Sequence, residues 1–431
     1  MSRSLGRRQR RVAAIAGALA LAFAFGGCTG GTIDPGASFG AVDDTIAGDT
    51  ATVLQQLLAD AVALSGSSGG LAAVAAPWAG EWRGVAGTVG FDDGAAAVEP
   101  GQVFHLAGVT SEVTCLVLLR LADDGVLGLD DPVSEHVIDI PGLDGITLEH
   151  LCRQTSGLAD YYPQLRVNFM QNPARVWSPI ELISSALAVP RIGEPGQAVA
   201  FSRTNGLLLG LALERATHRS WSDLVEEYVA GPLGLTGTTL PSPTTLDVPG
   251  LIGAYAALPG PDGAPDCAAR LDDSRQSSSM GGAAAGARSH LDDVVRLSQA
   301  FASGLLLSER TAREQWTTTP VPGAEPWVAQ GIGGMVYGPL RGLASEATGA
   351  LTAAFTDPTT GLTVVVALNN SSAGQDFVRE TAFALASVAS KTPAASGETQ
   401  PLVELPWSVD QATQRMQELA RCAPPPPPAE G

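Results

Sequence analysis

Apolar residues recur along this chain with two different periods, and each period predicts a different kind of element. Leucines and valines at helical spacing predict a first helix over residues 51–63 and a strongly apolar helix over 110–123. Two apolar runs joined by a Pro-Trp-Ala-Gly turn predict strands at 71–76 and 81–89. The remaining helices are predicted at 147–153, 179–188, 205–217, 221–229, 291–303 and 376–388.

A second pair of strands is predicted late in the pattern. Residues 351–356 and 362–369 are apolar runs that flank an Asp-Pro-Thr-Thr-Gly turn. The order of strands, a helix-rich middle, then strands and a helix is typical of an α+β fold whose sheet is completed by both ends of the chain. We therefore expect one domain over residues 51–390, without internal repeats.

The first 27 residues predict an export signal. Five arginines precede residue 12, and residues 12–27 form an uncharged run that is shorter than the roughly 20 residues of a membrane-spanning helix. The run ends in Phe-Gly-Gly before Cys28, like a bacterial lipobox. We expect residues 1–27 to be a signal peptide, and a lipid on Cys28 to anchor the exported protein to the outer face of the cell membrane. Secretion with an unmodified cysteine is the alternative. The Gly-, Ala- and Asp-rich residues 28–50 predict a flexible tether.

Residues 391–431 differ in composition and apolar pattern from the domain that precedes them. Residues 392–400 predict a polar linker, and Ser408 with Gln411 predicts the capping box of a short helix. A run of prolines at 424–428 follows and predicts a disordered end.

Composition narrows the class of protein. Of the 431 residues, 45% are hydrophobic and 16% are charged, which is enough for a sizeable core and excludes wholesale disorder. Acids outnumber bases by 44 to 25, for a net charge of −19. Such a chain repels phosphate backbones, so we expect no nucleic-acid partner. Lys391 is the only lysine.

Export implies an oxidising compartment, in which cysteines tend to pair. Besides Cys28, the cysteines are Cys115, Cys152, Cys267 and Cys422, which allow three connectivities. We expect Cys115–Cys152 within the core and Cys267–Cys422 fastening the tail. The five histidines are scattered and no C-x-x-C pair is present. We therefore expect neither a metal nor another cofactor.

Six motifs follow one another along the chain. They are FHLAGVTS at 104–111 with GLDDPV at 128–133, ITLEHLCRQTSGL at 146–158, EPG at 194–196 leading to FSRTN at 201–205, GPLGL at 231–235, TT at 238–239, and DPTTGLTVVV at 357–366. In this order they resemble motifs of the serine β-lactamase and D-alanyl-D-alanine carboxypeptidase superfamily, with class C β-lactamases and related esterases as the nearest branch. The resemblance covers about residues 51–390. It implies an antiparallel sheet flanked by helices, with a helix-rich insertion in the middle of the chain.

The resemblance also implies a catalytic site, whose first motif is lost here. The family uses a serine nucleophile at a helix N-terminus and a lysine three residues later, one turn apart, where the amine can take the hydroxyl proton. The corresponding positions here are Gly108 and Ser111. Because Val388 stands three residues before the single lysine, Lys391, no Ser-x-x-Lys pair exists anywhere in the chain.

The other motifs are degenerate as well. The family's proton-shuttling tyrosine is replaced by Arg203, which is always protonated, whereas Asn205 is retained. In the third motif, Ala347-Thr348-Gly349 keeps the glycine of His-x-Gly or Lys-Thr-Gly and loses the cation. Gln154 replaces the histidine of the family's HTSGL motif.

These losses lead to three hypotheses. The favoured one is an exported pseudoenzyme whose cleft binds a peptide or small carboxylate ligand through Ser111, Arg203, Asn205 and Thr348. The alternative is a working carboxypeptidase, esterase or β-lactamase with Ser111 as a relocated nucleophile, assisted by His105 or His150. The third is a structural envelope lipoprotein whose cleft is filled by side chains. An open polar cleft would favour the first hypothesis over the third.

Overall fold

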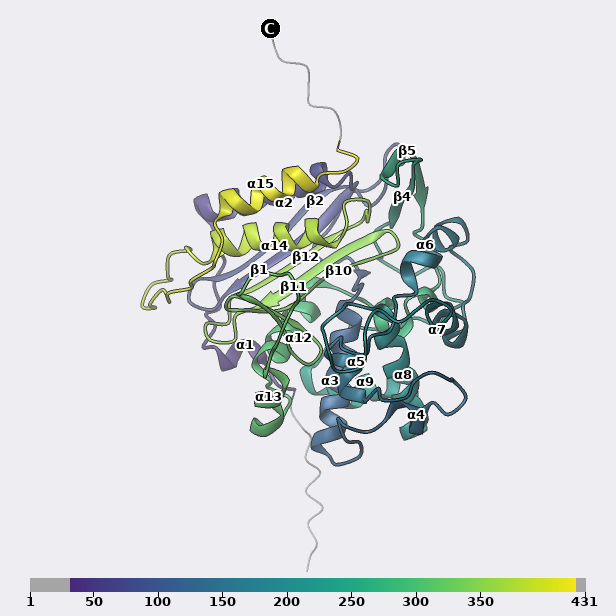
Figure 1. The fold of residues 1–431 in the computed structure, drawn as a ribbon. Coiled ribbons are helices and arrows are strands. Elements are labelled where there is room, and N and C mark those ends of the chain that lie inside the picture. Colours follow the sequence, from purple (N-terminus) through teal and green to yellow (C-terminus); the bar gives the residue numbers. More distant parts are fainter. Residues whose placement is uncertain (1–31, 424–431) are drawn as a thin grey trace, which may run out of the picture. The chain divides into compact units, whose positions relative to one another are not determined.

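The computed structural model of the chain describes residues 32–423, which contain an eight-stranded antiparallel sheet with helices on both faces (Figure 1). In spatial order the strands are β2 (Gly80–Gly87), β1 (Gly69–Ala76), β12 (Thr363–Leu368), β11 (Ala350–Thr356), β10 (Leu340–Ala347), β9 (Met335–Tyr337), β8 (Val328–Gln330) and β7 (Thr319–Pro320). The first and last parts of the domain meet where β1 pairs with β12. The expected α+β architecture is confirmed.

The central strands are buried on both faces because helices cover each side of the sheet. In β1, Leu71 and Ala73 pack into one apolar cluster, whereas Ala72 and Val74 pack into the other. Successive side chains of a strand point to opposite faces, so a strand covered on both sides appears in the sequence as a continuous apolar run. This placement accounts for the uninterrupted pattern that predicted these strands.

One face of the sheet carries the two ends of the domain, and the other carries its helical middle (Figure 1). The first group comprises α2 (Gly48–Leu64), α14 (Gln375–Ala389) and α15 (Val409–Leu419). The second group includes α3 (Val109–Asp123), α4 (Val133–His136), α5 (Leu148–Cys152), α6 (Tyr162–Gln171), α7 (Pro179–Leu187), α8 (Arg203–Thr217), α9 (Trp221–Val225), α10 (Gly231–Leu233), α11 (Gly282–Ala285), α12 (Leu291–Ser303) and α13 (Glu309–Gln315).

The strongly periodic segments confirm their predictions to within two or three residues. One predicted helix differs in kind: α9 ends at Val225 and continues as a π-helical turn over Glu226–Ala230. The sequence pattern missed β7 to β10 and the hairpin of β4 (Tyr255–Pro259) with β5 (Pro265–Asp272). Two further short strands, β3 (Phe104–His105) and β6 (Arg288–Ser289), pair with each other under the N-terminus of α3. Those of the missed strands that have only two or three residues carry too few positions to show a period.

Part of the expected tether is structured and packs against the domain. Ile33 donates its backbone N–H to Pro232, and the short helix α1 (Pro35–Ser38) is capped by Asp34. Ile46 is buried, and its backbone N–H bonds to Glu81 at the edge of β2. Because these residues bury apolar surface and pair their backbone, residues 32–50 belong to the domain.

The segment after residue 391 also belongs to the domain. Thr392 accepts a hydrogen bond from the Trp78 indole at 2.9 Å, and the rings of Trp407 and Phe383 stack 3.8 Å apart. Ser408 and Gln411 form the predicted capping box, and Met416 of α15 is buried against the sheet-covering helices. The predicted boundary near residue 390 therefore does not separate two bodies.

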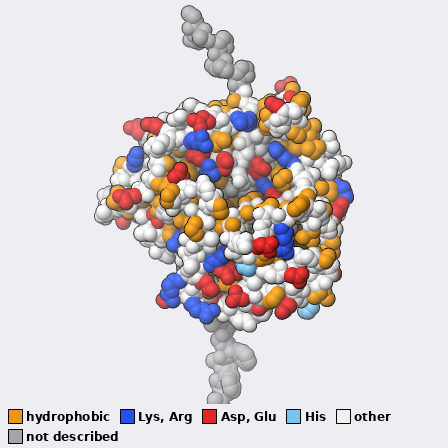
Figure 2. Space-filling view, viewed as in Figure 1, with side chains coloured by type: hydrophobic (Ala, Val, Ile, Leu, Met, Phe, Trp, Pro, Cys, Tyr) orange, Lys and Arg blue, Asp and Glu red, His pale blue; other side chains and the backbone are white. Residues whose placement is uncertain are grey.

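Both expected disulfides are present, joining Cys115 to Cys152 and Cys267 to Cys422. In Figure 2, acidic side chains lie among basic and apolar ones over the face that is drawn. No helix within residues 32–423 is both long and apolar enough to cross a bilayer. The predicted signal peptide, Cys28 and the proline run lie outside the described residues.

The Cys267–Cys422 bond closes a loop of 155 residues and ties α15 to the β4–β5 hairpin. We expect the double variant Cys267→Ser/Cys422→Ser to lose about 2–5 kcal/mol of unfolding free energy, because removing the crosslink frees the unfolded chain. Urea denaturation of the oxidised protein, the reduced protein and the variant measures this. An unchanged midpoint in the variant would contradict the role assigned to the bond.

Candidate active site

The N-terminus of α3 is the position where the resembled family carries its nucleophile. The residue there is Gly108, whose backbone φ of −65° is ordinary for any amino acid. A glycine at this position is therefore not required by the backbone conformation. The space around it gives a different reason.

Ser345 of β10 occupies the space that a side chain at position 108 would need. A Cβ placed on Gly108 would lie 2.7 Å from the Ser345 Cβ and closer still to its hydroxyl oxygen. Ser345 itself is 1% exposed. The N-terminus of α3 can thus lie close to β10 because Gly108 has no side chain, and the Ser345 side chain fills the space next to it.

This contact corrects the expected position of the third motif. The residue of β10 that faces the start of α3 is Ser345, whereas Ala347 and Gly349 stand at the tight turn into β11. Gly349 has a φ of +79°, and a Cβ there would meet Ala254 and Tyr255. Its glycine is thus required by the turn. The strand residue that contacts the start of α3 thus lies two positions before Ala347 and four before Gly349.

Ser111 lies one turn into α3, in the position of the family's lysine. It is 9% exposed, and its hydroxyl donates to the Gly108 carbonyl oxygen at 2.6 Å. Thr114, one turn further along, donates to the Ala283 carbonyl and accepts from the Trp221 indole. Both hydroxyls therefore serve packing of the helix.

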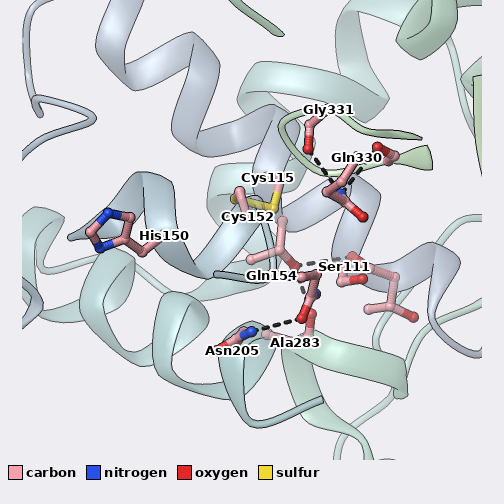
Figure 3. Close-up of a disulfide and its surroundings, with 12 residues drawn as sticks. Ser111, Cys115, His150, Cys152, Gln154, Asn205, Ala283, Gln330 and Gly331 are labelled. Atoms are coloured by element: carbon pink, nitrogen blue, oxygen red, sulfur yellow. Dashed lines mark hydrogen bonds between the residues drawn. A yellow bond between two sulfur atoms is a disulfide. The ribbon is translucent and has the colours of Figure 1, made fainter. Parts of the chain in front are cut away.

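Neither histidine proposed as a partner for Ser111 is hydrogen-bonded to it. His150 accepts a bond from Thr147 in the capping box of α5, and Figure 3 shows it on the far side of the Cys115–Cys152 disulfide from Ser111. His105 is buried, and burial followed by the nearby charge of Arg288 lowers its pKa well below the usual value. No described group thus serves as a base for Ser111.

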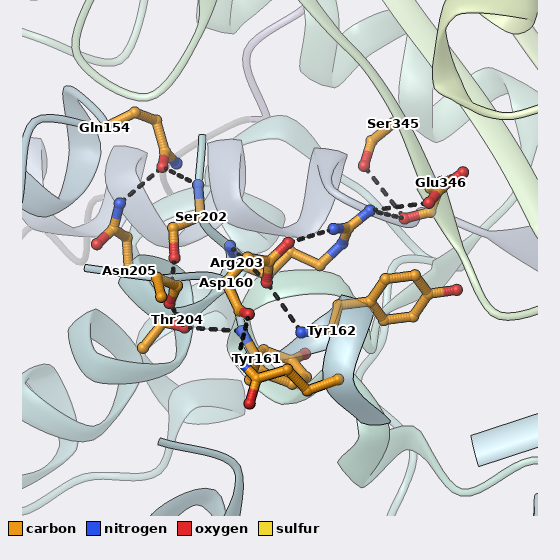
Figure 4. A network of polar contacts seen from close by, with 12 residues as sticks. Gln154, Asp160, Tyr161, Tyr162, Ser202, Arg203, Thr204, Asn205, Ser345 and Glu346 are labelled. Carbon is orange, nitrogen blue, oxygen red and sulfur yellow. Dashed lines mark hydrogen bonds and ion pairs between the residues drawn. The ribbon is translucent and has the colours of Figure 1, made fainter. Parts of the chain in front are cut away.

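Asn205, the residue retained from the second motif, is used in an internal network (Figures 3 and 4). Its amide donates to the Gln154 side-chain oxygen at 2.7 Å, and its own oxygen accepts from Ser156 at 2.5 Å. Gln154 also accepts the Ser202 backbone N–H, and its φ of +57° is unusual for a residue with a side chain. The amide pair holds the start of α8 against the loop that follows α5.

Arg203 lies across the cleft with its charge already matched (Figure 4). Its guanidinium pairs with Asp160 at 2.5 Å and with Glu346 at 3.5 Å, and it lies 4.2 Å from the centre of the Tyr162 ring. It also donates to the Glu346 carbonyl oxygen, which lies in the part of β10 that is not paired with β9. Burial alone would lower the pKa of Arg203, but the charges of Asp160 and Glu346 raise it overall. Arg203 therefore offers no free cation to a carboxylate ligand.

The tyrosines beside Arg203 do not replace the lost proton shuttle. Burial, and then the charge of Glu346, raises the pKa of Tyr162 to about 12. Burial also raises the pKa of Tyr161, whose hydroxyl donates to the Met280 carbonyl. Both phenols stay protonated at neutral pH, so neither can take a proton from a serine.

What remains of the cleft beside Arg203 is a small pocket. Its volume is about 20 Å³, and its lining includes Tyr162, Arg203, Arg288 and Thr348. Thr348, a predicted ligand contact, is 2% exposed and donates to the Tyr162 hydroxyl at 3.4 Å. Ligand pockets for small molecules are usually some 300–1,000 Å³. A peptide does not fit this space.

A larger, mainly apolar pocket of about 420 Å³ lies elsewhere, between α7, α8 and the loop that leads to α11. Trp177, Leu207 and Trp221 line it, with Glu214 as its one carboxylate. It contains none of the residues predicted for the site. Within residues 32–423, no group of three or more His, Cys, Asp or Glu side chains is arranged to hold a metal ion.

The sequence analysis did not identify three residues that shape the site, namely Ser345, Asp160 and Glu346. Asp160 follows the SGL motif by two residues, but its place beside Arg203 depends on how two loops fold together. Ser345 and Glu346 lie on a strand whose small residues gave no clear period. Nothing local marked any of the three.

The fold and motifs have relatives among known proteins. The family described as Beta-lactamase matches residues 54–389. Penicillin-binding protein 4* of Bacillus subtilis is 27% identical over 33% of this chain and 31% of its own length. The D-alanyl-D-alanine-carboxypeptidase/endopeptidase AmpH of Escherichia coli is 32% identical over 33% of this chain and 38% of its own. The matches thus span about a third of these relatives.

Solved structures match over a longer part of the chain. A D-stereospecific amidohydrolase from Streptomyces has a TM-score of 0.66 and 26% identity, covering 77% of this chain and 98% of its own. The octameric penicillin-binding protein homologue of Pyrococcus abyssi has a TM-score of 0.64 at 19% identity, covering 78% and 77%. The second likeness concerns the fold alone.

The contact between position 108 and Ser345 is testable by restoring the lost side chain. We expect Gly108→Ser to cost about 1–3 kcal/mol of unfolding free energy through overpacking, and Ser345→Gly in the same chain to recover most of that loss. Denaturation of the two single variants and the double variant gives the coupling energy. Gly101→Ser is the control, since a Cβ there has nothing within 4 Å. Additive effects of the two substitutions would refute the steric exchange.

Proposed function

This chain belongs to the beta-lactamase family, and we propose that it is a non-acylating member that serves as a structural or binding protein of the cell envelope. The observation that carries the proposal is the contact between Gly108 and Ser345. A nucleophile is absent on the helix, and the strand's serine leaves no room for one. Both of these positions, in addition to Ser111 and Arg203, would have to change before the family's catalytic geometry returned.

The ion-pair network of Arg203 supports the same conclusion. In a serine acyl-enzyme, the acylated oxygen needs an open cleft beside the helix N-terminus and a base within hydrogen-bond reach. Here Arg203, Asp160 and Glu346 cross that cleft, and the neighbouring tyrosines hold their protons. A buried ion pair is costly to break on one side, by about 3–5 kcal/mol, so the charge pairing of Arg203 opposes reopening of the cleft.

The small size of the pocket beside Arg203 favours the structural hypothesis over a ligand bound there. Its volume of about 20 Å³ is far below the roughly 300–1,000 Å³ of usual small-molecule sites. Among the pockets described above, the one between α7 and α8 has the volume of a small-molecule site. A binding role for this protein therefore rests on that pocket or on its outer surface.

The hydrolase alternative makes a direct prediction that can be measured. We expect the intact mass of purified residues 29–431 to stay unchanged after incubation with a fluorophosphonate and, separately, with a penicillin, because the Ser111 hydroxyl is hydrogen-bonded to the Gly108 carbonyl oxygen and to no described base. A penicillin-binding enzyme treated in parallel shows that the reagents are active. A stoichiometric adduct could map to Ser111 and disappear in Ser111→Ala. This result would establish a relocated nucleophile and contradict the proposal.

The envelope assignment rests on the export signal and Cys28. We expect the full chain to partition with membranes and into detergent, and Cys28→Ser to be released, because the thiol is where the lipid is attached. Fractionation of producing cells, followed by detection of the protein in each fraction, measures the difference. A wild-type chain that is recovered entirely outside the membrane fraction would instead indicate ordinary secretion.

A further inference from the structure

A second arginine lines the small pocket beside Arg203. Arg288 lies on β6, which pairs with β3 under the N-terminus of α3, and it is only 2% exposed. The cavity wall beside it also includes Tyr162 and Thr348, from different parts of the chain. Arg203 and Arg288 thus both line one small pocket.

The two arginines differ in their partners. Arg203 has Asp160 and Glu346 within ion-pair distance, whereas Arg288 has no carboxylate within 4 Å in the described part of the chain. Arg288 donates through Nη1 to the Gly286 carbonyl oxygen, and its Nε has no hydrogen-bond partner. Its cross-strand neighbour His105 is a base, so it supplies no negative charge.

The charge of Arg288 persists despite its burial. Burial lowers the pKa of Arg288 to about 9, so at neutral pH the guanidinium remains charged. His105, whose pKa is lowered well below the usual value, stays neutral beside it. A buried charge without a counter-charge is strongly destabilising, and proteins compensate for it by pairing. The described residues leave this positive charge uncompensated.

We propose that the cavity beside Arg288 binds a single halide-sized monovalent anion, with chloride as its ordinary occupant. The size fits: a water molecule needs about 10–15 Å³ by this measure, and the cavity offers about 20 Å³. The anion supplies the missing counter-charge and fills the space left by the closure of the family's cleft.

The lining also supplies a neutral donor. The Tyr162 hydroxyl accepts from Thr348 and keeps its own proton, because the pKa of Tyr162 is raised to about 12. That proton is free to be donated to an anion in the cavity. The carboxylates nearby, Asp160 and Glu346, are turned to Arg203 instead. The site thus combines one desolvated cation with an uncharged donor, which suits a weakly hydrated anion.

The test compares chloride with gluconate, which is too large for the cavity, at constant ionic strength. We expect the Tm of the wild-type chain to rise by about 2 °C or more as chloride replaces gluconate between about 1 and 200 mM. We expect Arg288→Met to melt at the same temperature in both salts. Equal melting curves of the wild type in the two salts would overturn the proposal.

Arg341→Met is the matched control, because Arg341 is also partly desolvated, with a lowered pKa, and donates to a carbonyl oxygen. It does not line the cavity. We expect this variant to keep the chloride dependence, and its loss there would contradict the assignment to Arg288. If Arg288→Met fails to fold, anomalous scattering from wild-type crystals grown in bromide shows whether an anion occupies the cavity. A bromide peak beside the Arg288 guanidinium supports the site, and a cavity holding water only refutes it.

Discussion

The close approach of α3 to β10 is the constraint on which the rest of the site depends. Gly108 and Ser345 meet with no room for a further side chain, so the helix N-terminus lies directly on the strand. This contact leaves no room for a side chain at the position of the family's nucleophile. The hydroxyl of Ser111 has the carbonyl of Gly108 as its partner. The fold of the family is kept, whereas the space for its nucleophile is not.

The ion pairs of Arg203 stabilise the arrangement of the loops beside this contact. In the family, the same loop position carries a group that moves protons, which requires a pKa that can be shifted towards neutrality. Here the position carries a permanent cation held by two carboxylates and by the face of Tyr162. Charge pairing replaces proton transfer at this point, and Asn205 and Gln154 fix the start of α8 beside it. The retained asparagine is thus explained by packing of the loops, without a ligand.

The rest of the molecule holds these elements in register. The sheet is completed by β1 and β12 from opposite ends of the domain, and α2, α14 and α15 cover one of its faces. The Cys115–Cys152 bond joins α3 to α5 close to the amide network, and Cys267–Cys422 fastens the last helix. The segments expected to be a tether and an appended tail contribute to the same core. Their apolar residues were too widely spaced in the sequence to show this.

The sequence by itself determined the family, the α+β order of elements and the absence of a Ser-x-x-Lys pair, and it favoured both disulfides among three possible connectivities. Each depends on residue identity, or on a period that survives in one dimension, such as the apolar spacing of α3 or the continuous run of β1. Only the tertiary structure decided that Ser345 faces Gly108, that Arg203 pairs with Asp160 and Glu346, and that Arg288 has no acidic partner among residues 32–423. These facts depend on which loops and strands meet. The contacts join residues that lie from 43 to more than two hundred positions apart, and no local pattern encodes them.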